Sequence, residues 1–168
     1  MSEAVFAFGS NMCSGRLREY SVAPERPGVA AVLSKYRLRF NKRSLDGSGK
    51  ANVENDSASE VWGVLYSIPE DQLAALDQGE GSGYSRERVV VLGRDGTSSK
   101  AWVYVATEPD ADPELRPYWW YKRFLVERAK EHELPPAYVE RLEAIEAMDD
   151  LDAARDRSKR SLLCKGAG

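Results

Sequence analysis

The order of its apolar patterns is the feature that most constrains the fold of this chain. Segments rich in β-branched and aromatic residues, which are typical of strands, occupy the first two thirds of the sequence, and helical spacing dominates the last third. Gly63, inside the most regular strand pattern, predicts a bulge or a close approach of another backbone. This order predicts an α+β fold, a small mixed β-barrel with flanking helices. The strand patterns cover residues 4–8, 29–33, 36–40, 51–54, 60–67, 84–92 and 100–105, and the helical patterns cover 14–20, 69–79, 118–131 and a stretch after Pro135 and Pro136.

The chain of 168 residues is long enough for one domain with its own core. No repeat or linker divides it, so we expect a single domain over residues 1–150. Residues 151–168 are expected to form a loosely ordered C-terminal tail with a solvated basic cluster. That cluster consists of Arg155, Arg157, Lys159, Arg160 and Lys165.

Charge and hydropathy argue against two classes of partner. The chain has 24 Lys and Arg against 27 Asp and Glu, a net charge of −3, so no basic excess exists to neutralise nucleic-acid phosphates. No apolar run approaches the about 20 residues that span a bilayer. The first residues also lack the basic and apolar segments of a signal peptide. We therefore expect a cytoplasmic protein that binds neither nucleic acid nor membrane.

The single histidine, His132, limits the chemistry that the chain can perform. A zinc site with several histidine ligands is excluded, and a Ser-His-Asp or Cys-His site would have to use His132, whose neighbours are charged. Cys13 and Cys164 lie far apart and form no C-x-x-C motif, so neither a disulfide framework nor a metal site is indicated, and their role stays open. If the chain is an enzyme, its acid–base group is expected to be a carboxylate.

The stretch FAFGSNM, residues 6–12, ends a strand in small polar residues. Gly, Ser and Asn commonly form turns after strands, which is one interpretation. The other is a binding loop whose backbone N–H groups face an anionic or carbonyl oxygen. The local pattern leaves both open.

A second candidate is Glu80, which lies between Gly79 and Gly81 in the stretch LDQGEGSGY. Glycine on both sides leaves the carboxylate free to turn into a cleft and lets a ligand approach the backbone. The alternative is a helix C-cap turn with an incidental surface acid.

Aromatic residues add two weaker signals. Tyr121 lies on a helix face that is otherwise apolar, so its hydroxyl either enters a pocket or belongs to the core. Trp119 and Trp120 are adjacent and cannot both face inward. One of them is expected at a pocket rim or a partner surface, which is compatible with a homodimer.

Five blocks, in order, resemble motifs of the γ-glutamylcyclotransferase family, which includes γ-glutamylamine cyclotransferases and AIG2-like proteins. FAFGSNM resembles its aromatic-x-Tyr-Gly-Ser-Asn-Leu/Met loop, EVWGVLYSI its central strand, and LDQGEG its Leu-Asp-x-x-Glu-Gly motif. GYSRERV resembles the strand that follows, and PYWWYKRFLVERAKEHELPPAYVERLEAI resembles its tyrosine-bearing helix pair. The resemblance extends from residue 4 to about residue 148.

The resemblance implies the small cyclotransferase barrel and a reaction that needs neither cofactor nor metal. The α-amine of a small γ-glutamyl substrate attacks its own γ-carbonyl and releases 5-oxoproline together with an amino acid or amine. Glu80 corresponds to the catalytic glutamate and would act as general acid and base with a pKa raised by burial. Backbone N–H groups of residues 9–12 would hold the oxyanion. The substrate-binding residues that the resemblance implies are Phe8, Gly9, Ser10, Asn11, Met12, Tyr84 and Tyr121.

Two positions depart from the family pattern. Phe8 stands where the family usually has tyrosine, and the missing hydroxyl puts substrate preference in question. Arg128 stands where relatives often carry glycine, and we expect it to change only a helix surface or an interface.

Several alternatives stay open at this point. The leaving group is not identified, and γ-glutamyl amines and glutathione are both candidates; the loops at residues 41–50 and 106–117 are expected to hold the specificity residues. A different class would be a non-catalytic small-molecule binding or interaction protein on the same fold, or an interaction domain built on the two tryptophans. An enzyme predicts Glu80 facing residues 9–12 across a cavity with Tyr121 on its wall, whereas an interaction protein predicts a filled cavity and exposed tryptophans.

Overall fold

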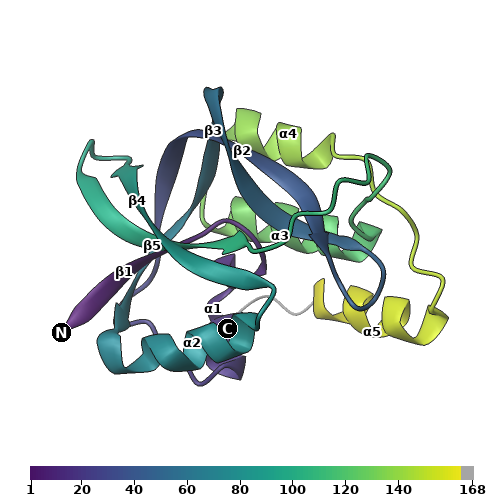
Figure 1. Cartoon of the computed structure of the whole chain (residues 1–168), viewed down its shortest axis with the longest axis horizontal. Coiled ribbons are helices and arrows are strands. Elements are labelled where there is room, and N and C mark those ends of the chain that lie inside the picture. Colours follow the sequence, from purple (N-terminus) through teal and green to yellow (C-terminus); the bar gives the residue numbers. More distant parts are fainter. Residues whose placement is uncertain (164–168) are drawn as a thin grey trace.

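The computed structural model describes residues 1–163, and at its centre these residues form a closed barrel of five strands (Figure 1). The strands are β1 (Ser2–Ala7), β2 (Val29–Arg43), β3 (Gly49–Pro69), β4 (Tyr84–Gly93) and β5 (Ser98–Ala106). Their order around the barrel is β1-β3-β2-β4-β5, with antiparallel neighbours, and a parallel contact between Val5 and Trp102 closes β1 against β5. The prediction of a small mixed barrel is confirmed.

Two strands are longer than their sequence patterns indicate. Residues 29–33 and 36–40 belong to one strand, β2, and residues 51–54 and 60–67 belong to β3. The register between β2 and β3 shifts between Ser34 and Tyr36, where Lys35 has a φ of +65°. Backbone pairing along the hairpin therefore overrides the weak strand propensity of the polar residues at these joins.

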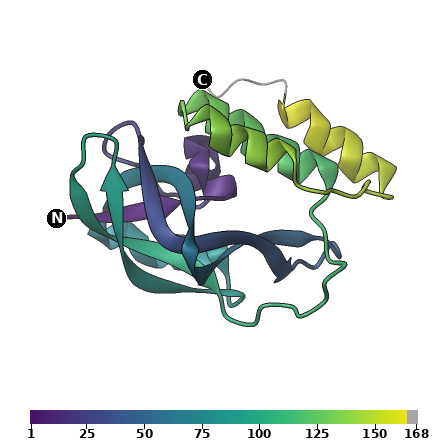
Figure 2. The same cartoon turned by 90° about the horizontal axis from the view of Figure 1, so that it is seen from above.

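The helices gather largely on one side of the barrel, where α3, α4 and α5 lie together (Figure 2). Their bounds are α1 (Ser14–Glu19), α2 (Leu73–Glu80), α3 (Trp119–Glu131), α4 (Pro136–Glu143) and α5 (Ala153–Leu163). Short 3₁₀ turns at Ser10–Met12 and Glu70–Gln72 precede α1 and α2. The first four helices agree with the helical patterns of the sequence, and none of the helices in residues 1–163 has the length and apolarity needed to cross a membrane.

Helix α5 corrects the expectation of a loosely ordered tail. Arg155 forms an ion pair with Asp150 at 2.6 Å, and the side chain of Asp150 is fully buried. Asp150 also accepts a hydrogen bond from the indole N–H of Trp120 at 2.9 Å, and these partners hold its pKa at about 2, below its usual range. Residues 153–163 are therefore fixed to α3 by a buried carboxylate. Cys164 and Lys165 lie outside the described residues, and Cys13 is a free thiol.

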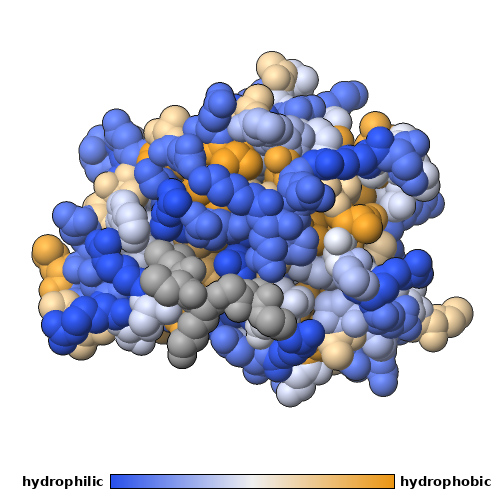
Figure 3. Space-filling view, turned by 180° about the vertical axis from the view of Figure 1, so that it is seen from behind, coloured by the Kyte–Doolittle hydropathy of each residue, from blue (hydrophilic) through white to orange (hydrophobic). Residues whose placement is uncertain are grey.

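Both tryptophans of the adjacent pair pack against groups of the same chain. Trp120 is buried, and the guanidinium of Arg160, on α5, lies 4.1 Å from the ring centre of Trp119. The homodimer stays a prediction, and these side chains add no support to it. On the face that Figure 3 shows, hydrophilic side chains predominate and hydrophobic ones form separate patches.

Strand β3 passes β1 so closely at Gly63 that a side chain has no room there. A Cβ at this position would lie 2.3 Å from the carbonyl oxygen of Ala7 and 2.8 Å from the ring of Phe6. The close backbone approach that the sequence predicts at Gly63 is confirmed.

We expect Gly63→Ala to destabilise the protein, because the new methyl group can be accommodated only if the backbone of β1 shifts. Overpacking of this kind costs about 1–3 kcal/mol. Ser57→Ala, at an exposed position of the same strand, should change stability by less than about 0.5 kcal/mol. Denaturant unfolding of both variants measures the difference, and equal free energies of unfolding would contradict the steric argument.

Candidate active site

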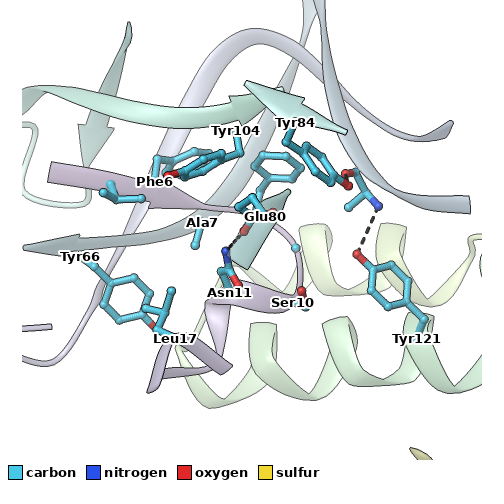
Figure 4. A pocket seen from close by; sticks show the side chains of 14 residues that line it. Phe6, Ala7, Ser10, Asn11, Leu17, Tyr66, Glu80, Tyr84, Tyr104 and Tyr121 are labelled. Atoms are coloured by element: carbon cyan, nitrogen blue, oxygen red, sulfur yellow. Dashed lines mark hydrogen bonds between the residues drawn. The ribbon is translucent and has the colours of Figure 1, made fainter. Parts of the chain in front are cut away.

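The loop after β1 and the last turn of α2 meet at a cavity of about 50 Å³ (Figure 4). Phe8, Gly9, Ser10 and Asn11 line it from the loop, and Glu80 faces them from α2. Two tyrosines, Tyr84 and Tyr121, also line it. Residues separated by up to about 110 positions in the sequence are thus brought to one site, as the resemblance implied, with Met12 as the exception.

Glu80 points into this cavity toward the side chain of Asn11 (Figure 4). The amide Nδ2 of Asn11 donates a hydrogen bond to Oε1 of Glu80. Burial raises the pKa of Glu80 above its ordinary value, because a charged carboxylate loses its hydration there; the hydrogen bond from Asn11 and the charge of Arg16 oppose the shift without cancelling it. The carboxyl group is therefore suited to exchange protons closer to neutrality.

Glycine is required on each side of Glu80 for a different structural reason. A Cβ at Gly79 would lie 2.3 Å from the ring of Tyr20, so only glycine lets α2 approach α1 so closely. Gly81 has a φ of +73°, and its N–H donates to the carbonyl of Asp77 at 3.0 Å, which ends the helix. The turn is a helix C-cap, but Glu80 is a half-buried cavity residue and not an incidental surface acid.

The loop at residues 9–11, which lines the cavity, contains backbone N–H groups without a protein partner. Within the described part of the chain, no protein group accepts a hydrogen bond from the N–H groups of Gly9, Ser10 or Asn11. The carbonyl oxygen Oδ1 of Asn11 is likewise buried without a partner among these residues. Unpartnered backbone N–H groups at a cavity are suited to stabilise a developing negative charge on oxygen.

Met12 does not take the role expected of it. Its N–H donates to the carbonyl of Gly9 at 3.0 Å and closes the 3₁₀ turn, so the expectation of a fourth oxyanion donor is wrong. Its side chain is fully buried, and its own carbonyl accepts a hydrogen bond from the hydroxyl of Tyr66 at 2.6 Å. The imidazole Nε2 of His132 lies 2.7 Å from the same carbonyl. Met12 and His132 therefore anchor the loop from behind.

Tyr84 and Tyr121 both contact the backbone of Ala51. The hydroxyl of Tyr84 donates to the Ala51 carbonyl at 2.8 Å, and the hydroxyl of Tyr121 accepts from the Ala51 N–H at 3.2 Å. A Cβ at Gly9 would lie 3.4 Å from the Tyr121 hydroxyl, so this oxygen borders the loop. Because Tyr121 uses only its acceptor here, its proton remains able to reach a ligand. Burial raises the pKa of both phenols, which keeps them protonated.

Tyr104 is a cavity residue that sequence reasoning missed, because a tyrosine in an alternating strand is typical of the core. Its hydroxyl donates to Asp77 at 2.7 Å, and Asp77 also pairs with Arg86 at 2.7 Å. The position of Asp77 in LDQGEG is the signal that could have indicated this support. Phe8, the departure from the family pattern, is a buried part of the cavity wall and brings no polar group to it.

A larger groove, of about 660 Å³, adjoins the cavity. Ser10, Glu80, Tyr84 and Tyr121 line both, so they form the junction. The walls of the groove come from α1, the β2–β3 loop, α3 and α5. The contribution of α5 to a site was not predicted from the sequence.

Arg128 also lines the groove, which corrects the expectation of a surface position. It is 6% exposed and pairs with Glu131 at 2.9 Å, and its Nη1 lies 4.0 Å from the thiol of Cys13. In the described residues, no group of three or more His, Cys, Asp or Glu side chains is arranged to hold a metal ion.

The arrangement pairs a proton-exchanging carboxylate with backbone donors across a small enclosed space. A carbonyl group bound between them could be attacked while the donors stabilise its oxygen and Glu80 moves the protons. The predicted contrast between enzyme and interaction protein is answered by the geometry: Glu80 faces the loop across a cavity, and Tyr121 forms part of the wall.

Comparison with known proteins gives matches over most of the chain. The model of the AIG2-like family matches residues 60–142. The human protein named gamma-glutamylcyclotransferase is 32% identical over 156 residues, covering 86% of this chain and 79% of that protein, and the mouse protein of the same name is 31% identical over 149 residues, covering 84% and 77%. A solved structure titled gamma-glutamyl cyclotransferase superposes with a TM-score of 0.85 at 28% identity, covering 99% of this chain and all of that one.

The hydrogen bond from Asn11 stabilises the charged form of Glu80, so removing it should raise the pKa of Glu80 further. We expect Glu80 to titrate at a higher pH in Asn11→Ala than in the wild-type protein. Titration of the Glu80 carboxyl carbon by NMR measures the shift. Asn55→Ala, at an exposed position of β3, is the control and should leave this titration unchanged. A Glu80 pKa that is the same in Asn11→Ala and wild type would show that the hydrogen bond does not govern it.

Proposed function

The chain belongs to the γ-glutamylcyclotransferase family, and we propose that it converts a γ-glutamyl compound into 5-oxoproline and an amino acid or amine at the cavity between residues 9–11 and Glu80. The observation that carries this assignment of the site is the position of Glu80, a half-buried carboxylate whose cavity is also lined by residues 9–11, with backbone N–H groups that have no protein partner among the described residues. The proposal concerns a small-molecule substrate and a reaction whose steps are proton transfer and acyl transfer.

In the first step the α-amine of the substrate attacks its own γ-carbonyl. The amine arrives as an ammonium group and must lose a proton before its lone pair can form the new C–N bond. Glu80 takes this proton. Because burial raises the pKa of its carboxyl group, this pKa lies closer to that of the substrate ammonium group, which favours the transfer.

The tetrahedral intermediate carries a negative charge on the former carbonyl oxygen. The N–H groups of Gly9, Ser10 and Asn11 are the donors available to this oxyanion. Because these groups are already fixed by the turn that Met12 closes, they need little reorganisation during the reaction.

Collapse of the intermediate breaks the bond between the γ-carbon and the leaving nitrogen. Glu80, now protonated, gives its proton to that nitrogen, so the leaving group departs as a neutral amine. The carboxylate then takes the second proton of the attacking nitrogen, which keeps one hydrogen as the lactam N–H, and passes this proton to the released amine or to water, which restores the carboxylate. One group with a pKa between those of a free carboxyl and an amine can serve both steps.

The cavity wall supplies positioning. The hydroxyl of Tyr121 borders the loop and has an unused proton for the substrate, and Tyr84 fixes the backbone of Ala51 beside it. Holding the amine against the carbonyl in a curled conformation lowers the entropic cost of ring closure. We also propose a cytoplasmic location, which the scarcity of cysteine favours.

The test is release of 5-oxoproline from γ-glutamyl amino acids, γ-glutamyl amines and glutathione. We expect turnover by the wild type and a loss of about 10²- to 10⁴-fold in kcat for Glu80→Gln, because the amide cannot exchange the proton. Glu87→Gln, an exposed change on β4, should retain full activity. Circular dichroism establishes that the variants are folded. The acid limb of the wild-type pH profile should follow the NMR titration of Glu80 and lie above 4.5, the ordinary pKa of a glutamate.

Two results would contradict the proposal. One is a folded wild-type protein that releases no 5-oxoproline from any member of the panel. The other is a Glu80→Gln variant whose kcat equals that of the wild type.

A further inference from the structure

The groove beside the cavity has a charge balance that the proposed reaction does not explain. In the described part of the chain its cationic lining residues are Arg16, Lys50, Arg128, Arg155 and Lys159, and its acidic ones are Glu19, Asp46 and Glu80. Since Glu80 is reserved for proton exchange, the remainder of the groove is distinctly cationic. A groove of this kind favours a ligand that carries a negative charge.

Lys50 is a cation of the groove that lies beside Tyr121, a residue of the junction of groove and cavity. It precedes Ala51, whose backbone is bound by Tyr84 and Tyr121. Its ammonium nitrogen lies 4.6 Å from the ring centre of Tyr121 and 4.6 Å from that of Trp120. A group that leaves the cavity past Tyr121 therefore meets the ammonium of Lys50.

The ammonium of Lys50 has a hydrogen-bond donor to spare. It donates to Oδ2 of Asp46 at 2.9 Å and to the hydroxyl of Ser48 at 3.0 Å, and an ammonium group has three N–H bonds. Within residues 1–163, no protein acceptor uses the third. The Lys50 side chain is only 18% exposed, so a hydrogen bond made with this donor would be shielded from water.

The neighbours of Lys50 leave it incompletely neutralised. Asp46 divides its oxygens between Lys50 and the N–H and hydroxyl of Ser48. Arg155 and Lys159 come from α5, and Lys159 lies 5.4 Å from the centre of the same Trp120 ring. Burial lowers the pKa of Lys50, the ion pair with Asp46 opposes this, and the charges of Lys159 and Arg155 lower it further. An arriving carboxylate would relieve this repulsion.

We propose that Lys50 binds the carboxylate of the leaving amino acid or peptide, and so makes the enzyme select γ-glutamyl compounds whose leaving amine bears a carboxylate over simple γ-glutamyl amines. The inference rests on the proposed function, because it takes Glu80 as the end of the site where the bond is broken. The leaving amine starts at Glu80, passes Tyr121 and places its carboxylate against the free N–H of Lys50, with α5 adding positive charge.

Other cations of the groove are less well placed for this role. Arg16 pairs with Glu19 on its own helix, and the guanidinium of Arg128 pairs with Glu131. Arg128 still has a buried Nε without a partner among the described residues, so it is the competing candidate and belongs in the experiment.

The experiment compares two substrates that differ in one charge, γ-glutamyl-alanine and γ-glutamyl-alaninamide. The carboxylate of the first accepts a charge-assisted hydrogen bond that the neutral carboxamide of the second replaces poorly. We expect the wild type to favour the first by about 10- to 100-fold in kcat/KM. In Lys50→Met this preference should fall to within about threefold, and Lys50→Arg should restore most of it. Lys100→Met, an exposed change on β5, should leave it unchanged.

The ratio of the two substrates is measured on one preparation, so a partial loss of folded protein cancels. A wild type that turns over both substrates equally well would overturn the inference. An equal loss on both substrates in Lys50→Met would also overturn it, because it would mean that Lys50 acts only on the structure. A preference lost in Arg128→Met and kept in Lys50→Met would assign the role to Arg128.

Calorimetry with Glu80→Gln separates this inference from the proposed function. We expect this variant to bind γ-glutamyl-alanine more tightly than γ-glutamyl-alaninamide, and the double variant with Lys50→Met to lose the difference. If that result were obtained and the wild type released no 5-oxoproline, the proposed function would fail and the carboxylate site would stand. Equal binding of both compounds by Glu80→Gln would overturn the carboxylate site alone.

Discussion

The burial of the Glu80 carboxylate beside the amide of Asn11 is the interaction on which the site depends. A carboxylate loses much of its hydration in such a place, and it remains there because a donor on another element faces it. That hydrogen bond joins the loop after β1 to the end of α2, which are 69 residues apart. Burial raises the pKa of the acid, and the contact with Asn11 limits this rise and also ties the acid to the loop, so geometry and acid–base behaviour are linked.

The remaining architecture serves to keep these two elements in place. Gly63 lets β3 cross β1 in close contact, and the loop continues directly from the end of β1. Met12 closes the turn and is anchored by Tyr66, while Gly79 lets α2 pack on Tyr20, the residue that follows α1. The contacts of Gly63, Tyr66 and Gly79 join distant parts of the chain, so the barrel and the short helices frame the site.

The sequence predicted the parts of the molecule that depend on local pattern or on a motif. The α+β barrel, the strand of Gly63 and the pairing of Glu80 with the loop at residues 9–11 were all indicated. The role of Met12 was not, because whether an N–H closes a turn depends on backbone geometry and not on residue type. The charges of residues 153–163 predict a solvated tail, because they do not reveal the buried partner Asp150 or the indole that this carboxylate also binds.

The groove beside the cavity shows more clearly what cannot be predicted from the sequence. The loop at residues 41–50 was expected to hold specificity residues, and Lys50 lies at its end. What singles out Lys50 is the proximity of Trp120, Tyr121 and two cations of α5, which only the folded chain brings together. A lysine in a polar loop is ordinarily solvated; a shielded lysine with an unused donor at a cavity mouth is not.

The phenylalanine at position 8 supports a role of this groove in substrate discrimination. The side chain of Phe8 is buried in the cavity wall next to Phe6, with ring centres 6.4 Å apart, so this part of the wall is apolar. The hydroxyl of Tyr104 cannot replace the missing one, because it is committed to Asp77. Polar recognition inside the cavity is therefore left to the loop, Glu80 and Tyr121, which in the proposed reaction act on the γ-glutamyl part common to every substrate. Discrimination between leaving groups must then come from outside the cavity, where the charges of the groove lie.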